Sequence, residues 1–391
     1  MTPLEMQMKE FESRRNAGLG GHFAAPALDK SVTRGLLSED AFISMLYLER
    51  RRSERAQKRF VLVLVDVQEI LADNGKDRNV SLITTTLSNV LRETDILGWY
   101  LTNSLIGVIG TELANATNQA IQNGFLTKIR DAFENSLGTK KAASIFVSFH
   151  FFPEDYAGKD DHSANIALYP DLQRKEKRQR LSLALKRGMD VVGSAAALLL
   201  FSPVFAAVAI AVKLSSKGPV LFKQERLGQY GKPFQVVKFR SMRTDCDSKI
   251  HEQYVSQFIA GKVEGQGDTG EKPVYKIQKD PRVTKVGTFI RKTSLDELPQ
   301  FWNVLMGDMS LVGPRPPVVY EFRSYEVWHR RRVLEIKPGI TGLWQVEGRS
   351  RTRFDDMVRL DLKYARGWSL WLDTKIILQT PLAVIMGDGA H

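Results

Sequence analysis

The sequence predicts an α/β protein in two parts: a front α/β sandwich, and a mainly α part that inserts into a membrane from one side. Helical and strand-like patterns alternate between residues 41 and 155. Farther along, no charged residue occurs between Val191 and Val212, which is long enough to reach through a bilayer at about 20 residues per crossing. We therefore expect a flexible leader (1–40), a front domain (41–155), a basic linker (156–182) and a C-terminal domain (183–391).

The leader is polar and rich in Gly and Pro, with a short helix expected over Glu5–Arg14. In the front domain, apolar periodicity predicts helices over 41–58 and 80–92. The apolar run RFVLVLVDV (59–67) predicts a buried strand, and further strands are expected over 105–110 and 143–152. This alternation is typical of a sheet covered by helices.

The apolar segment is interrupted at Ser202-Pro203, where proline removes a backbone donor and clashes with the preceding turn. Lysines and arginines flank both ends of the segment, so the positive-inside tendency places both ends in the cytoplasm. A re-entrant hairpin over about 186–214, broken at Ser202-Pro203, satisfies both observations, and the Ser202 hydroxyl is placed to satisfy freed backbone groups. A straight crossing and a buried core helix are the alternatives.

The formal net charge of +12, from 56 Lys and Arg against 44 Asp and Glu, favours anionic partners: nucleic acid, an anionic membrane or phosphorylated substrates. The single cysteine, Cys246, allows no intrachain disulfide, so a reducing cytoplasm is the expected home of the folded domains. The N-terminus is too charged for a secretory signal.

The densest chemical stretch is residues 284–316, where Asp296 and Glu297 lie between Arg291 and Arg315. A carboxylate pair among cations suits phosphate chemistry: one carboxylate attacks phosphorus while the other helps to hold Mg²⁺. The alternative is a capping box, in which Ser294 and Glu297 only satisfy backbone amides at a helix start. Both readings can hold at once, because a helix N-terminus also attracts phosphate.

Further basic residues lie beside strand or turn signals: Lys238 and Arg240 in VVKFRSM, Arg282 in DPRVT, and Arg349 in VEGRS. Each could instead be a solvated surface charge. Turn sequences at GPRP (313–316) and KPGITG (337–342) can bring backbone amides and a fixed arginine to a phosphate.

Together, the Ser202-Pro203 break, KFRSM, SLDELPQFWNVLMGDMSLVGPRP, KPGITGLWQVEGR and WSLWLDTKII closely resemble the bacterial sugar transferase family of monotopic phosphoglycosyl transferases, over about residues 183–391. The resemblance implies a re-entrant helix, Mg²⁺, a UDP-sugar donor and undecaprenyl phosphate as acceptor. It also implies the inner membrane of a bacterium, cytoplasmic face, and the first membrane step of exopolysaccharide, capsule or O-antigen assembly.

By the same resemblance, Asp296 attacks the donor's β-phosphate, releases UMP and forms a phosphosugar-enzyme intermediate that the lipid phosphate displaces. Glu297 is the second catalytic carboxylate, and both carboxylates are the metal ligands. Arg291, Arg315 and Arg349 look like phosphate and nucleotide ligands, and Lys238 with Arg240 borders the site. Glucose and galactose phosphates are the usual donors in the family's long members.

The front domain resembles a degenerate GGDEF (diguanylate cyclase) domain. LVDVQEI, with Asp66, is similar to the metal-aspartate strand, and VLRETDILGWYLTNSLIGVIG to the helix, signature turn and next strand. Residues 101–105 lack the signature's glycines and acid, so cyclase activity is expected to be absent. Arg92 and Asp95 stand where the family's inhibitory cyclic di-GMP site lies; a surface ion pair is the alternative.

An enzyme is therefore the leading hypothesis. Its competitor is a non-catalytic, membrane-bound cyclic di-GMP receptor. Nucleic-acid binding would also explain the charge, but the basic residues sit around the apolar segment and inside motif turns, so no nucleic-acid partner is expected. Both resemblances fit a homodimer.

Overall fold

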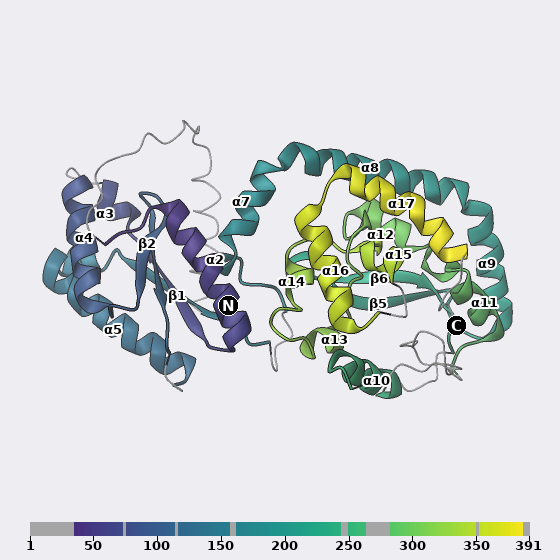
Figure 1. Ribbon diagram of the computed structural model, residues 1–391, viewed down its shortest axis with the longest axis horizontal. Helices are drawn as coiled ribbons and strands as arrows, with labels where there is room; N and C mark the ends of the chain where they lie inside the picture. The colour runs from purple at the N-terminus through teal and green to yellow at the C-terminus, as the bar shows by residue number, and fades with distance from the viewer. Residues whose placement is uncertain are drawn as a thin grey trace.

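The computed structural model describes residues 35–72, 76–113, 116–156, 162–243, 249–262, 282–348 and 352–385. The helix expected over Glu5–Arg14, Cys246 and Arg349 lie outside these ranges. The described chain forms two lobes side by side (Figure 1). The strands of the front lobe end at Phe152, and Ala164, Leu168 and Tyr169 of the predicted linker still pack against its core. The second lobe contains the apolar segment.

The front lobe is a mixed α/β unit built on an antiparallel sheet in the order β2-β3-β1-β4. Its strands are β1 (Phe60–Asp66), β2 (Ile96–Leu101), β3 (Leu105–Gly110) and β4 (Phe146–Phe152). Its helices are α2 (Glu39–Ala56), α3 (Gln68–Ala72), α4 (Lys76–Val90), α5 (Asn118–Leu137) and α6 (Thr139–Ala142).

Helices cover both faces of this sheet. Phe42 and Leu46 of α2 pack on one face, and residues of α4 and α5 such as Leu87 and Phe133 pack on the other. Both faces of β1 are therefore apolar and buried, which is why the strand reads as a continuous apolar run. The predicted alternation of helices and strands is confirmed.

The C-terminal lobe is mainly helical. Its helices are α7 (Pro170–Arg178), α8 (Arg180–Leu200), α9 (Ser202–Ser215), α10 (Lys249–Ile259), α11 (Lys285–Lys292), α12 (Gln300–Met306), α13 (Val319–Arg323), α14 (Arg331–Leu334), α15 (Leu343–Glu347), α16 (Phe354–Gly367) and α17 (Leu370–Ile385). The hairpin of β5 (Leu221–Leu227) and β6 (Pro233–Phe239) and the parallel pair β7 (Ser310–Val312) and β8 (Gly339–Thr341) lie among them. Short 3₁₀ turns are η2 (Ile166–Leu168), η3 (Gln229–Gly231) and η4 (Leu295–Glu297).

Helices α8 and α9 meet at the predicted break with a bend of 60°, an open angle along one edge of the lobe (Figure 1). Pro203 has no N–H for the Leu199 carbonyl, and the Ser202 hydroxyl donates to that carbonyl instead, at 2.8 Å. Among the described residues no single helix is long and apolar enough to cross a membrane; α8 and α9 qualify only as a bent pair.

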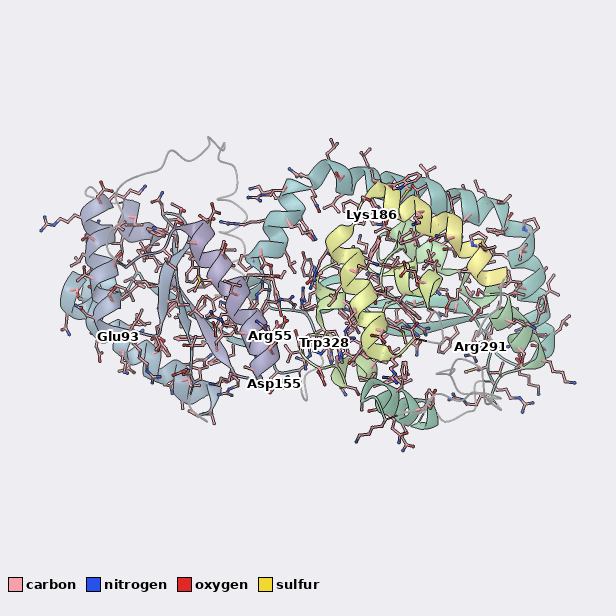
Figure 2. The ribbon with its side chains drawn as sticks, in the orientation of Figure 1. Arg55, Glu93, Asp155, Lys186, Arg291 and Trp328 are labelled. Carbon is pink, nitrogen blue, oxygen red and sulfur yellow. The ribbon has the colours of Figure 1, made fainter. Side chains whose placement is uncertain are left out.

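Buried polar contacts fix the first half of α8 to the lobe. Lys186 forms a 2.6 Å ion pair with Asp373, and the Asp190 carboxylate accepts from the Ser310 hydroxyl and the Leu311 amide. Figure 2 shows Lys186 between α8 and α17. The second half of α8 exposes Leu199 and Leu200. Helix α9 exposes Ile210 and Leu214 on one side and buries Val208 and Val212 on the other.

Candidate active site

The acid pair lies at a sharp turn between two short helices. Thr284 caps α11 by accepting from the Gly287 amide at 2.9 Å. A Cβ at Gly287 would meet the Ser241 carbonyl at 1.9 Å, so only glycine lets α11 pack against the exit of β6. Ser294 then adopts a left-handed conformation (φ 58°), which turns the chain into η4 with Asp296 and Glu297.

The capping-box alternative is wrong. The Ser294 side chain makes no capping hydrogen bond, and η4 is a three-residue 3₁₀ turn. The Glu297 side chain points instead to Lys238, whose ammonium lies 2.9 Å from Oε1. Because the Glu297 carboxylate does not cap the backbone, it is available to bind a cation or a substrate.

Asn303 of α12 fixes the strand that carries Lys238. Its side-chain oxygen accepts from the Val237 amide at 3.0 Å, and its nitrogen donates to the Gln235 carbonyl at 2.7 Å. The amide thus occupies the free edge of β6 as a neighbouring strand would. Since α12 follows η4 directly, this contact sets Lys238 beside Glu297.

The two carboxylates have opposite pKa shifts. Burial raises the pKa of Asp296, and the charge of Glu297 raises it further, while Lys238 and Arg291 act against this rise. Burial alone would raise the pKa of Glu297, but Lys238 and Arg315 outweigh burial and hold that pKa well below its usual range. A pair with separated pKa values is typical of catalytic carboxylates.

A small pocket opens beside Glu297, which is 31% exposed. It is lined by Arg226, Val236, Lys238, Glu297, Gln300, Arg315, Pro316, Gly339, Ile340 and Gln345. The cations Arg226, Lys238 and Arg315 converge on it from β5, β6 and the loop after β7. Such a concave group of fixed cations suits a diphosphate.

Arg226 and the pocket glutamines were not predicted from the sequence. Arg226 is buried, and burial and the nearby Arg315 lower the pKa of its guanidinium. In the sequence it is one charge in the polar strand KQERL, which reads as a solvent-facing hairpin. The pairing of β5 with β6 places Arg226 opposite Phe234 and Lys238 opposite Phe222, so the two cations lie on the same face of the hairpin.

The loop that carries Arg315 is fixed at every carbonyl from Pro314 to Pro317. The donors, in order, are the Gly339 amide (2.9 Å), the Arg332 guanidinium (3.4 Å), the Arg226 guanidinium (2.6 Å) and the Leu227 amide (2.9 Å). Proline offers no amide in return, so the loop is held through its acceptors. The Arg315 side chain itself projects outward at the pocket rim.

The structure separates the other predicted cations. Arg291 acts on Asp296 through its charge and lies at the end of α11 (Figure 2). Arg240 is buried away from the pocket lining: its guanidinium donates to the backbone carbonyls of Ser216 and Lys217 and so fixes the end of α9. Arg282 adjoins the bridge between Met242 and Val283 and is not among the pocket residues.

The acid pair fits Mg²⁺ by the nature of its donors. Asp296 and Glu297 supply hard carboxylate oxygens, and their adjacent charges would be relieved by a cation. No group of three or more His, Cys, Asp or Glu side chains gathers within the described ranges. A metal held here would therefore take its remaining ligands from substrate phosphates and water, as Mg²⁺ does in phosphoryl-transfer sites.

Exposed apolar side chains of three neighbouring helices form an apolar surface on the same lobe. They are Val192, Leu199 and Leu200 of α8, Ile210 and Leu214 of α9, and Trp371, Leu378 and Leu382 of α17. Figure 1 shows α8 and α17 running together along one edge, with α9 continuing that edge. Exposed patches of this kind mark membrane or partner contacts.

In the front lobe, Arg92 and Asp95 form a turn after α4. The Asp95 carboxylate accepts from the Arg92 amide at 3.0 Å, and burial raises the pKa of Asp95. The Arg92 side chain is exposed. A cyclic di-GMP site at these residues stays a prediction.

Relatives with known names match the C-terminal lobe. Over 209 residues the chain is 45% identical to the galactosyl transferase CpsE of Streptococcus agalactiae. This match covers 53% of this chain and 44% of the relative. It is 45% identical to the UDP-glucose:undecaprenyl-phosphate glucose-1-phosphate transferase of Escherichia coli (53% and 41%) and 38% identical to the exopolysaccharide production protein ExoY of Rhizobium meliloti (53% and 88%). The chain thus spans less than half the length of the first two relatives.

The front lobe has structural neighbours among GGDEF domains. One is the GGDEF domain of DgcB from Caulobacter crescentus in complex with c-di-GMP, with 15% identity, a TM-score of 0.25, and coverage of 34% of this chain and 78% of that one. At this score the likeness adds nothing to the assignment of the front lobe.

The family model for bacterial sugar transferases matches residues 181–387, more than half of the chain. The match begins at α8 and includes the acid pair, Lys238, the Arg315 loop and α17. The chain belongs to the bacterial sugar transferase family.

Proposed function

We propose that this protein transfers a hexose 1-phosphate from a UDP-sugar to undecaprenyl phosphate. The observation that carries the proposal is the partly buried Asp296 next to Glu297, a carboxylate that Lys238 holds ionised and that lines a pocket together with Arg226 and Arg315. The names of the relatives support the substrate classes, since they include undecaprenyl-phosphate sugar-1-phosphate transferases. Glucose and galactose are the donor sugars that these names suggest.

In the proposed reaction, the ionised Asp296 carboxylate attacks the β-phosphorus of the donor. A bond forms between Asp296 oxygen and phosphorus, and the bond from that phosphorus to the bridging oxygen breaks, so UMP leaves with the electron pair. An oxygen of the lipid phosphate then attacks the same phosphorus and displaces the Asp296 carboxylate. The products are undecaprenyl-diphosphate-sugar and free enzyme.

The pocket residues hold and neutralise the reacting phosphates. Lys238, Arg226 and Arg315 can donate to the diphosphate and stabilise the charge that develops on the leaving UMP. When bound by Asp296, Glu297 and the substrate phosphates, Mg²⁺ would shield the phosphorus from the repulsion of the incoming anion. Glu297 stays ionised in this arrangement, because the cations around it lower its pKa.

The apolar surface of α8, α9 and α17 supports a membrane location. We propose that the bent pair enters the bilayer and leaves on the same side, so that both flanks stay cytoplasmic. The exposed Trp371 of α17 suits the interface between headgroups and acyl chains. The acid pair would then face a lipid phosphate at the cytoplasmic surface of a bacterial inner membrane.

The proposal is tested by UMP release from protein in nanodiscs supplied with undecaprenyl phosphate, Mg²⁺ and a panel of UDP-sugars. We expect release with one sugar, and a loss of at least about 10³-fold with Asp296→Asn, which removes the nucleophile. Asp356→Asn, an exposed acid on α16, is the matched control and should release UMP at the unaltered rate. No release by the unaltered protein with any donor, with and without cyclic di-GMP, would instead favour a cyclic di-GMP receptor.

A further inference from the structure

Helix α14 lies where the two lobes meet, and the consecutive arginines Arg330, Arg331 and Arg332 contact different parts of the protein. Figure 1 shows α14 on the side of the C-terminal lobe that faces α2. Arg330, just before α14, donates to the Glu154 carbonyl at 2.9 Å, in the segment that leaves the front lobe. The helix is therefore tied to both lobes.

Arg331 connects α14 to the front lobe. Its guanidinium pairs with Glu335 and lies 3.9 Å from the Glu54 carboxylate of α2. Glu54 and Arg331 are 9% and 10% exposed, so little solvent screens them. Arg51 also pairs with Glu54, at 3.2 Å, which completes a cluster of alternating charges.

An apolar contact reinforces this link. Leu334 of α14 is 3% exposed and belongs to the same buried cluster as Phe42 and Leu46 of α2. The hydrophobic core of the front lobe thus continues into α14, and a movement of α2 would move α14 with it.

Arg332 connects α14 to the pocket. It forms a 2.7 Å ion pair with Asp361, with side chains 5% and 1% exposed, and it donates to the Arg315 carbonyl at 3.4 Å. The other carbonyls of the loop, from Pro314 to Pro317, are held by residues near the pocket itself. Among the hydrogen bonds to these four carbonyls, only the one from Arg332 comes from α14, the helix that faces the front lobe.

We propose that α14 couples the front lobe to the pocket: through Arg331 and Arg332, the position of α2 sets the position of Arg315 and hence the affinity for a nucleoside diphosphate. Arg331 and Arg332 are positioning residues, and the ligand class rests on the proposed function. The front lobe acts in this way as a part of the donor site's support rather than as a separate appendage.

The experiment compares the unaltered full chain with Glu54→Gln in nanodiscs. Calorimetry measures the Kd of UDP with Mg²⁺, and UMP release gives kcat and KM for the donor. Removing the Glu54 charge should weaken UDP binding and raise the donor KM by about fivefold, the low end of typical coupling between sites, with little change in kcat. Glu54→Asp should restore most of the affinity, because it keeps the charge.

Glu49→Gln is the matched control: the Glu49 carboxylate pairs with Arg52 on the same helix rather than with an arginine of α14. Amide hydrogen exchange at Gly339 and Gly313, next to Arg315 in space, provides a readout that needs no ligand, and it should quicken in Glu54→Gln alone. Equal UDP affinity and equal exchange in the two variants would overturn the coupling. A third outcome separates the two proposals. If the unaltered protein binds no UDP while exchange is still faster in Glu54→Gln, the proposed function is overturned and the mechanical link between the lobes stands.

Discussion

At the scale of single residues, the site depends on an acid pair whose charges are set unequally. Burial dominates the environment of Asp296 and raises its pKa, whereas Glu297 forms an ion pair with Lys238. The sequence predicted the pair and its cations Lys238, Arg291 and Arg315, because these residues lie close together along the chain or in one motif. It missed Arg226. It also grouped Arg240 with the site, whereas in the structure the Arg240 guanidinium donates to the Ser216 carbonyl at the end of α9.

The raised pKa of Asp296 predicts a pH dependence of UMP release. Below that pKa the carboxylate is protonated and cannot attack, so the rate should rise with pH through a midpoint above the ordinary aspartate value of about 3.9. Arg291 lowers the pKa of Asp296, so Arg291→Gln should move the rising limb to higher pH. The single-turnover rate constant for UMP release, measured against pH for the unaltered protein and for Arg291→Gln, tests both expectations.

Neutralising a cation elsewhere provides the control for this profile. Arg359, an exposed residue on α16, pairs with Asp356 and lies outside the pocket, so Arg359→Gln should leave the limb in place. An identical shift in both variants would mean that the net charge of the protein, rather than the nearby charge of Arg291, sets the midpoint. The acid pair titrates as a unit, so the measured midpoint belongs to both carboxylates.

At the scale of elements, the sequence predicted β1, β3 and β4 of the front sheet but not β2, and it predicted the ends of helices less well. The strand expected over 59–67 is β1, and the strand expected over 105–110 is β3. The helix expected over 80–92 ends at Val90, because the Arg92 amide donates to the Asp95 side chain in a turn instead of continuing the helical hydrogen bonds. The capping box failed for a related reason: the left-handed Ser294 directs its side chain away from the backbone it would cap.

The buried ion pair between Lys186 of α8 and Asp373 predicts that loss of Lys186 lowers the stability of the fold. Lys186→Met leaves the Asp373 carboxylate, which is 0% exposed, without its cation, although Tyr364 and Trp368 still donate to it. Breaking a buried pair in this way costs about 3–5 kcal/mol. Thermal unfolding in nanodiscs should show a lower Tm for Lys186→Met.

A double substitution tests the cause of that loss. Lys186→Met with Asp373→Asn removes both charges, so much of the stability should return. If the double variant is as unstable as the single one, packing of the lysine chain rather than its charge holds α8 in place.

At the scale of the whole molecule, α8 connects three features: it follows the junction of the lobes, crosses the top of the C-terminal lobe, and ends at the bend (Figure 1). The sequence predicted the two parts and the break, because composition changes sharply along the chain. It could not show how the lobes pack, since that packing depends on ion pairs such as Arg50–Asp171, whose members lie far apart in sequence. Membrane insertion and a homodimer stay predictions.

The apolar surface predicts a contribution of α17 to membrane binding. Replacing the exposed Leu378 and Leu382 by Asp removes apolar area worth about 1.5–3 kcal/mol per side chain, so partition into vesicles should fall by at least about tenfold. Co-sedimentation with phosphatidylglycerol vesicles measures this. Leu82→Asp on α4 of the front lobe is the control and should bind normally; weaker binding by the control alone would place the membrane contact on the other lobe.

The anchored loop around Arg315 has a consequence for the heat of binding. Because each carbonyl from Pro314 to Pro317 already has a donor, and the prolines have few backbone states to lose, a ligand meets a surface that is ordered in advance. Diphosphate binding should therefore carry only a small conformational-entropy penalty and a small heat-capacity change. If the proposed function holds, differences in affinity between donors would arise in the groups beyond the diphosphate, so the sugar and the base, rather than the phosphates, would decide which nucleotide this protein accepts.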